Sequence, residues 1–341
     1  MRAMVLERCA PIETRPLKLQ EIKKHQISRP DEVLLRIEAC GVCHSQLHSI
    51  EGDWQEIGIP PVLPTVPGHE VVGIVEEVGG AVTGLEVGDR AGITPLLDSC
   101  RSCTYCESGC EHLCESSVIT GESLRGGYAE YITVPEYFAT KVPRSMDPRY
   151  AAPLFCAGIT AYKAVKAAEP DRHRRLGIFG IGGVGHMAVQ FAASRGCQVT
   201  AVSRNEEHLA VARRLGASST ARYEGAPPDV AAGVASGGGP LDAAIVLAPA
   251  DGAVEAAAAS VRKGGMIVIA TVGGRPPFMA FEEKTIRGTL IGSPADMAEV
   301  VRECSSGRID VVYQEFPLEE ANEALGQLKE SRIPARAVLV P

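Results

Sequence analysis

The sequence contains four closely spaced cysteines in the segment SCRSCTYCESGCEHLCE, namely Cys100, Cys103, Cys106 and Cys114. The spacing C-x2-C-x2-C-x7-C lets a short lobe surround one metal ion with four thiolates, which is the closed tetrahedral arrangement of a structural zinc. Cys110 lies in the same segment and leaves the fourth ligand ambiguous, although its use in place of Cys114 would shorten the last loop to three residues. The pattern predicts a structural zinc lobe over about residues 95–116.

A second group of metal-binding side chains is spread along the chain. Cys43 lies in GVCHSQLH, His69 in PGHE and Cys156 in PLFCAGIT. Such a set supplies only three ligands, so a fold that brought them together would leave a position open for water or substrate, as a catalytic zinc requires. The alternative is a pair of buried thiols and an ordinary core histidine.

A glycine-rich segment follows the apolar run 176–179 and opens an amphipathic helix. In a strand–turn–helix context, glycines at this spacing let the backbone turn sharply and approach a pyrophosphate, whose charge then faces the helix N-terminus. A structural turn is the alternative. The segment predicts a dinucleotide site at Gly180, Ile181, Gly182, Gly183, Val184 and Gly185.

The end of the next predicted strand bears on the choice of cofactor. The run 199–202 ends at Ser203-Arg204, where an NAD-preferring domain would carry an acidic residue for the ribose hydroxyls. Ser203 and Arg204 instead suit a 2′-phosphate, Arg204 by a charge-assisted contact and Ser203 as a hydroxyl donor. The sequence therefore favours NADP(H), with NAD(H) as the alternative if Arg204 is only a surface charge.

The chain changes character near residue 151. Residues 1–155 contain short alternating stretches, such as 32–38 and 71–78, that predict strands closed by turns. From there to 294, Ala-rich helical segments alternate with apolar runs, which predicts a parallel sheet with helices on both faces. The fold class expected is α/β, with a β-rich domain over 1–155, a Rossmann dinucleotide-binding domain over 156–294 and a final segment over 295–341.

Composition excludes several classes of function. The 341 residues, 45% of them hydrophobic, suffice for two domains, and the net charge of −8 argues against a nucleic-acid partner. No apolar run approaches the ~18 residues of a membrane span, and the N-terminus lacks the apolar core of a signal peptide. The 11 cysteines cluster at ligand spacing, which favours metal binding over disulfides. A cytoplasmic protein is expected, with no membrane partner.

Taken together, the motifs resemble those of the zinc-dependent medium-chain alcohol dehydrogenases. The match runs through GVCHSQLH, PGHE, the four-cysteine lobe, GGYAEY, the Cys156 segment and GIGGVGH, and so covers nearly the whole chain. The resemblance implies a chaperonin-10-like catalytic domain to which the last segment returns. It also implies that zinc held by Cys43, His69 and Cys156 polarises an alcohol oxygen, so that a zinc-bound alkoxide forms and a hydride passes to the nicotinamide.

The resemblance assigns further roles. Ser45 and His48 match a relay that takes the alcohol proton to solvent, although His48 in isolation would be an ordinary loop histidine. Glu70 matches a residue that lies behind the metal in the family. That residue either binds the metal transiently or supports the ligands without binding it. The residues implied at the cofactor are His44, whose alternative is a plain surface role, together with Thr160 and Val272.

Two positions depart from the family pattern. Gln46 stands where many relatives carry an Asp that hydrogen-bonds the zinc-bound histidine, so a neutral amide replaces the usual carboxylate and either weaker metal retention or altered zinc acidity is expected. Pro95 lies in a segment without the Trp of some small-alcohol enzymes, so a roomier substrate pocket is expected. Trp54 is the aromatic residue expected to face the substrate, with a place in the core as its alternative.

The function expected is that of an alcohol dehydrogenase or aldehyde reductase with two zinc ions per chain, NADP(H), and medium-length or aromatic primary alcohols. One alternative is a zinc-free quinone or enone reductase of the same fold, but such relatives lack the Cys43, His69 and Cys156 set. Another is an inactive zinc-stabilised binding protein, but such a protein would not need Ser45 and His48. By analogy with short bacterial relatives, a homo-oligomer is expected, a tetramer or dimer.

Overall fold

The computed structural model describes residues 1–59, 62–172, 174–250, 252–272 and 280–341. The chain divides into two compact units. The first, here called the β-rich unit, comprises Met1–Cys156, Gly292–Ser305 and Val311–Pro341, and the second, the α/β unit, comprises Ala157–Ile291 and Ser306–Asp310. Within the described residues, no helix has the length and apolar character needed to cross a membrane.

The β-rich unit is built on a seven-stranded sheet, whose strands follow the order β16-β17-β3-β4-β5-β9 with β8 paired to β3. Two small two-stranded sheets accompany it. The strands are β1 (Arg2–Val5), β2 (Lys18–Glu21), β3 (Glu32–Val42), β4 (Val71–Val78), β5 (Arg90–Ile93), β6 (Leu96–Asp98), β7 (Val118–Ile119), β8 (Tyr131–Pro135), β9 (Ala139–Val142), β16 (Tyr313–Pro317) and β17 (Arg336–Val340).

Strand β3 is the centre of this unit. It pairs with β4, β8 and β17, and its apolar residues are buried on both faces, so Leu34 and Leu35 are both fully buried although they point to opposite sides. The helices of the unit are short. They are α1 (His44–Glu51), α2 (Thr104–Glu107), α3 (Pro148–Ala151), α9 (Pro294–Ser305) and α10 (Ala321–Lys329).

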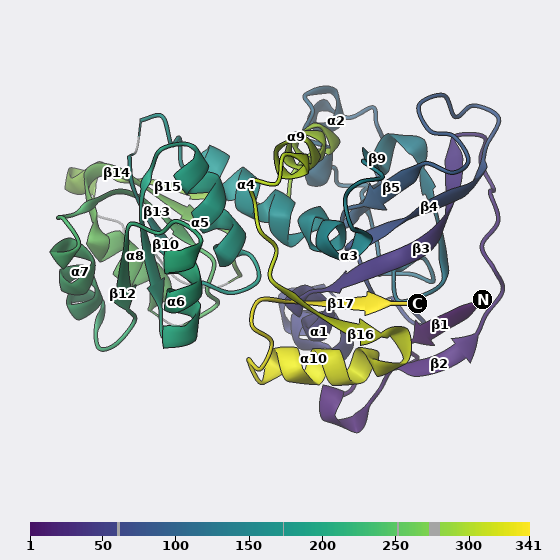
Figure 1. Ribbon diagram of the computed structural model, residues 1–341, viewed down its shortest axis with the longest axis horizontal. Helices are drawn as coiled ribbons and strands as arrows, with labels where there is room; N and C mark the ends of the chain where they lie inside the picture. The colour runs from purple at the N-terminus through teal and green to yellow at the C-terminus, as the bar shows by residue number, and fades with distance from the viewer. Residues whose placement is uncertain (60–61, 173, 251, 273–279) are drawn as a thin grey trace. The chain divides into compact units, whose positions relative to one another are not determined.

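The C-terminal strand lies beside the strand that leads into GVCHSQLH. β17 runs antiparallel to β3, with Ala337 opposite Val42 and Leu339 opposite Cys40. Figure 1 shows the yellow β17 and α10 next to the purple β3 and α1. This pairing carries the preceding residue, Arg336, to the start of β4 and the PGHE segment.

The α/β unit contains a six-stranded sheet in which every pair is parallel, in the order β12-β11-β10-β13-β14-β15. The order reverses between β10 and β13, and ligands bind at such a switch point beyond the carboxyl ends of the strands. The predicted Rossmann sheet is confirmed. Its strands are β10 (Arg175–Phe179), β11 (Gln198–Ser203), β12 (Ser219–Arg222), β13 (Leu241–Val246), β14 (Val261–Ile269) and β15 (Thr285–Gly288).

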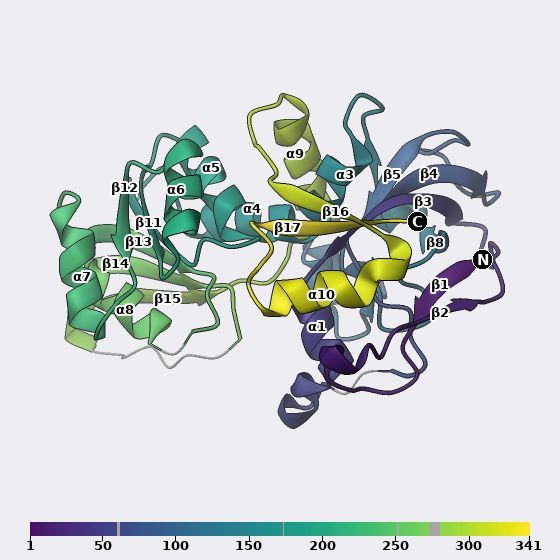
Figure 2. The same ribbon diagram turned by 60° about the horizontal axis from the view of Figure 1, so that its bottom comes forward.

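Helices cover both faces of this parallel sheet. Figure 2 shows α5 (Gly185–Ser194) and α6 (Glu206–Arg214) on one face, and α7 (Pro227–Ser236) and α8 (Ala253–Ser260) on the other. Right-handed crossover connections explain why the helices divide between the two faces. The chain first adds β11 and β12 on one side of β10, and then adds β13, β14 and β15 on the other side. The remaining helix of the unit, α4 (Ala157–Ala167), packs against α5.

Candidate metal centres and dinucleotide loop

The four cysteines of the lobe converge. Their sulfurs lie within 4.8 Å of one another, with 3.5 Å between Cys114 and Cys100, 3.6 Å between Cys103 and Cys106, and 3.9 Å between Cys100 and Cys106. Sulfurs held about 2.3 Å from a tetrahedral zinc lie roughly 3.8 Å apart, so the spacing fits that ion. The fourth member is Cys114, and Cys110 is outside the group.

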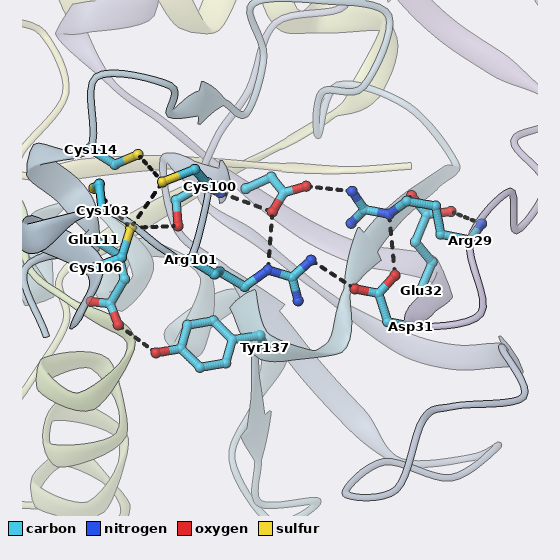
Figure 3. A network of polar contacts seen from close by, with 12 residues as sticks. Arg29, Asp31, Glu32, Cys100, Arg101, Cys103, Cys106, Glu111, Cys114 and Tyr137 are labelled. Carbon is cyan, nitrogen blue, oxygen red and sulfur yellow. Dashed lines mark hydrogen bonds and ion pairs between the residues drawn. The ribbon is translucent and has the colours of Figure 1, made fainter.

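Ion pairs connect the lobe to the loop that precedes β3. Arg101 lies between two cysteines of the lobe in sequence and donates to Asp31 at 2.9 Å, while Arg29 donates to Asp98 at 2.7 Å (Figure 3). On the other side of the lobe, the Tyr137 hydroxyl donates to the buried Glu111 carboxylate. These contacts fix the direction in which the lobe presents its thiols.

A second cluster forms from Cys43, His69, Glu70 and Cys156, whose ligand atoms all lie within 4.8 Å of one another. Cys43 stands between β3 and α1, the His69–Glu70 pair directly precedes β4, and Cys156 ends the short helix Ala152–Phe155. Cys43 Sγ and Cys156 Sγ are 3.9 Å apart, close to the edge of a zinc tetrahedron. The fold therefore brings together the three predicted ligands, which are distant in sequence, and places the Glu70 carboxylate in the same group.

The backbone turn that places His69 in the second cluster requires a glycine at position 68. Its φ of +99° is rarely adopted by other residues, and a Cβ there would lie 2.5 Å from the Tyr128 ring. Tyr128, from GGYAEY, is fully buried. The Gly68 N–H donates to Gln46 Oε1 at 2.6 Å, so helix α1 and the PGHE segment are joined directly.

Glu70 pairs with Arg336, a residue that no sequence motif singled out. Both side chains are buried, with 0% and 3% exposed, and the pair is a charge-assisted hydrogen bond. Burial raises the pKa of Glu70 to about 7, while Arg336 opposes the rise. Within the described residues, the buried Glu70 Oε2 has no hydrogen-bond partner, which leaves an acceptor free for a further ligand.

The two thiols of the second cluster differ electrostatically. The hydrogen bond from Cys156 lowers the pKa of Cys43 well below its usual value, with a further contribution from His69, and the same contact raises the pKa of Cys156. One thiolate is thus favoured even without metal. Because thiolates are the metal-binding form, this arrangement suits capture of a cation.

Helix α1 carries both expected relay residues, with Ser45 beside the second cluster and His48 closer to solvent. Ser45 Oγ lies 3.1 Å from Cys43 Sγ and 3.4 Å from His69 Nε2. His48, one turn further along, is 38% exposed and stacks on Trp54 with 5.8 Å between ring centroids. Its Nδ1 lies 2.8 Å from Asp53 Oδ2, a partner that the sequence analysis missed although it adjoins Trp54 in GDW.

The glycine-rich loop has the shape of a phosphate cradle. A Cβ at Gly180, whose φ is +100°, would lie 2.7 Å from Ala248 N, and one at Gly185 would lie 2.0 Å from Gly180 O. A Cβ at Gly182 would meet nothing, so the backbone there is open to a ligand. These are the three glycine roles of a dinucleotide loop, and α5 begins at Gly185. The residues present therefore fit a dinucleotide.

The other residues expected at the cofactor or substrate are placed as follows. Ser203 ends β11, is buried, and accepts a hydrogen bond from Asn205 N at 3.2 Å, while Arg204 is exposed and makes no ion pair within the described part of the chain. Thr160 is half-buried on α4, His44 is exposed at the start of α1, Val272 is exposed next to the undescribed range 273–279, Trp54 is half-buried and Pro95 is buried.

Comparison with known proteins identifies the family to which the chain is similar. Residues 29–144 match the family model of the alcohol dehydrogenase GroES-like domain, and residues 183–306 match that of zinc-binding dehydrogenases. An alcohol dehydrogenase of Geobacillus stearothermophilus is 39% identical over 99% of both chains. Among solved structures, the alcohol dehydrogenase of Aeropyrum pernix has a TM-score of 0.90 at 30% identity, with 100% of both chains covered. A cinnamyl alcohol dehydrogenase of Sorghum bicolor has a TM-score of 0.86 at 28% identity, with 99% of this chain and 97% of the other covered.

Proposed function

Because the chain belongs to the zinc-dependent medium-chain alcohol dehydrogenase family, we propose that it transfers a hydride between NADP(H) and primary alcohols of medium length or aromatic character. Alcohol dehydrogenase activity of the zinc type follows from the family itself. The substrate class and the cofactor preference are inferred from residues of this chain. The observation that carries the proposal is the buried Cys43, His69, Glu70 and Cys156 cluster with Ser45 beside it.

Each chain holds two zinc ions in this proposal. Cys100, Cys103, Cys106 and Cys114 bind the structural ion, and Cys43, His69 and Cys156 bind the catalytic ion, with Glu70 behind it or as a transient ligand. When bound, the catalytic zinc supplies Lewis acidity toward the alcohol oxygen, and the nicotinamide supplies the hydride acceptor. The three-residue ligand set leaves a coordination position for substrate.

The protein's own residues move the proton and exclude water. Ser45 Oγ is close enough to both Cys43 and His69 to accept the substrate hydroxyl proton at the metal position. His48, whose side chain is 38% exposed on α1, releases that proton, and Asp53 holds its Nδ1, which leaves Nε2 for proton exchange. Burial of the second cluster keeps bulk water from the reacting atoms.

The cofactor is held by the α/β unit, with His44 as a further contact to the pyrophosphate. The open backbone at Gly182 admits the pyrophosphate at the start of α5. The resemblance to the family assigns Thr160 and Val272 to the nicotinamide end. NADP(H) is preferred because the exposed Arg204 and the Ser203 hydroxyl stand where an acidic residue would repel a 2′-phosphate. Asn205 does not supply such an acid because its side chain is a neutral amide, which caps α6 by accepting from Glu207 N.

The substrate class rests on two residues. The Trp54 ring stacks on His48 and supplies an aromatic surface for the substrate. Pro95 is smaller than the Trp found in this segment of some small-alcohol enzymes, so it leaves a wider substrate pocket. The similarity to a cinnamyl alcohol dehydrogenase supports an aromatic substrate.

A panel of alcohols and aldehydes of graded length and aromaticity, assayed with NADP(H) and NAD(H), tests the proposal, with the zinc content of the same preparation measured by mass spectrometry. We expect two zinc ions per chain and highest kcat/KM for medium-length or aromatic primary alcohols with NADP+. Reduction of quinones without zinc would favour the zinc-free reductase, and one zinc without turnover would favour the inactive binder.

A further inference from the structure

The Gln46 side chain lies between two groups of the PGHE segment. Gln46 is 3% exposed, its Nε2 lies 3.0 Å from His69 Nδ1, and its Oε1 accepts a hydrogen bond from Gly68 N at 2.6 Å. One primary amide thus faces a backbone N–H and a ring nitrogen at the same time, in a place without solvent.

The backbone partner fixes the direction of the amide. A peptide N–H only donates, so the carbonyl oxygen of Gln46 must face Gly68, and the NH2 group then faces His69. An NH2 group only donates, so His69 Nδ1 must accept, which places the ring hydrogen of the neutral imidazole on Nε2.

Nε2 is the nitrogen on the metal side of the ring. Ser45 Oγ lies 3.4 Å from Nε2 and 3.1 Å from Cys43 Sγ, so Nε2 and the thiolate face the same space. A neutral histidine binds a metal through its unprotonated nitrogen and donates from the other one. Binding through Nε2 therefore requires an Nδ1–H, and that donor would meet the NH2 group of Gln46.

Turning the amide over does not remove the conflict. The oxygen would then accept from His69 Nδ1–H, but the NH2 group would face the buried Gly68 N–H. A buried donor without an acceptor is costly, because its hydrogen bond to water is lost and not replaced. With zinc bound, the site presents one donor to each end of the Gln46 amide, and only the carbonyl end can accept.

We propose that Gln46 is a positioning residue that favours the tautomer of His69 unable to bind zinc through Nε2, and so makes the catalytic zinc the more easily released of the two ions. The inference rests on the proposed assignment of Cys43, His69 and Cys156 as zinc ligands. A carboxylate of the same length would accept from both N–H groups and remove the conflict. The four-thiolate lobe contains no such residue and serves as an internal reference.

The test measures zinc release from the full-length protein into a chelator with an absorbance signal. Wild type should release one ion faster than the other, and Gln46→Glu should slow the fast phase by about 10- to 100-fold, the usual effect of a partner to a metal-binding histidine. The slow phase should not change. Ser49→Asp, which adds a negative charge one turn along α1, controls for charge and should leave the fast phase within about threefold of wild type, well below the effect of a hydrogen-bond partner.

A second measurement reports the tautomer directly. In zinc-depleted protein labelled with 15N-histidine, the His69 signals, identified by their absence in His69→Ala, should carry the hydrogen on Nε2 in wild type and on Nδ1 in Gln46→Glu. Equal release rates for Gln46→Glu and wild type, or an Nδ1–H tautomer in wild type, would overturn the proposal. A protein that takes up no zinc beyond the lobe, even with zinc supplied in excess, would instead overturn the proposed function.

Discussion

His48 Nδ1 lies 2.8 Å from Asp53 Oδ2, at the surface end of helix α1. The carboxylate accepts the Nδ1–H, so Nε2 is left for proton exchange and the ring is held against Trp54. Asp53 is thus a positioning residue for the proposed relay.

We expect Asp53→Ala to lower kcat for alcohol oxidation by about two- to fivefold, since an exposed charged pair contributes 1 kcal/mol or less. His48→Gln should cost more, up to about 10²-fold and chiefly at low pH, because the terminal base itself is lost. Asp53→Asn should recover most of the activity, since its amide oxygen still accepts from Nδ1. Steady-state kinetics across pH provide the measurement, and an unaltered pH profile in His48→Gln would remove both residues from the relay.

The structural lobe should be separable from catalysis. Cys103→Ser removes one of four thiolates, so we expect loss of one zinc ion, a lower Tm and lower solubility, because metal binding to such a lobe contributes directly to folding. Cys110→Ser is the matched control, since Cys110 lies in the same segment but outside the cluster. Zinc content and thermal unfolding check both variants. Equal losses in the two would contradict the assignment of Cys114 as the fourth ligand.

Glu32 makes the stability of the folded protein depend on pH. Burial alone would raise its pKa, but hydrogen bonds from Ser28 and Arg29, with Arg29's charge, outweigh it and hold the pKa of Glu32 below its usual value. A lowered pKa in the folded state contributes stability above the unfolded value of 4.5, and this is lost as pH falls through the lower folded value.

We therefore expect Glu32→Gln to lower Tm at neutral pH, and the deficit to shrink as the pH falls below 4.5. Glu13→Gln is the control, because Glu13 is fully exposed and its ion pair contributes little. Thermal unfolding followed by circular dichroism from pH 7 to pH 3 measures the difference. A deficit for Glu32→Gln that is the same at every pH would show that charge at this position is irrelevant.

The cofactor preference should depend on Ser203 and Arg204. One partly exposed Arg should favour a 2′-phosphate by about 1.5–3 kcal/mol, which is roughly a 10- to 100-fold advantage in kcat/KM for NADP(H) over NAD(H). Ser203→Asp combined with Arg204→Ala should reverse it, since the new carboxylate repels the phosphate and accepts from the ribose hydroxyls. If wild type uses NAD(H) at least as efficiently, Arg204 is a surface charge.

Sequence reasoning went furthest where chemistry is local. The lobe and the loop at 180–185 could be predicted because their spacing within one segment fixes a turn geometry, and the parallel sheet followed from alternating apolar and Ala-rich runs. The spacing favoured Cys114 as the fourth ligand but left Cys110 as an alternative, because a shorter last loop also permits a tetrahedral site. The fold places Cys114, and not Cys110, in the cluster.

Long-range partners were beyond the sequence. Arg336 reaches Glu70 only because β17 pairs with β3, and no periodicity in the sequence encodes that register. Gln46 was recognised as a departure, but its conflict with Gly68 depends on hydrogen-bond directions that only coordinates give. Asp53 had a weak signal in its position next to Trp54, five residues after His48.

The central claim is that the buried cluster of Cys43, His69 and Cys156 is the catalytic zinc site. The most direct test is turnover of Cys43→Ser, a change of one atom, in protein whose fold is verified and whose zinc content is counted. We predict that zinc falls from two ions to one per chain, that the Tm stays near that of wild type because the lobe is intact, and that alcohol oxidation is lost. Wild-type turnover in Cys43→Ser would contradict the account.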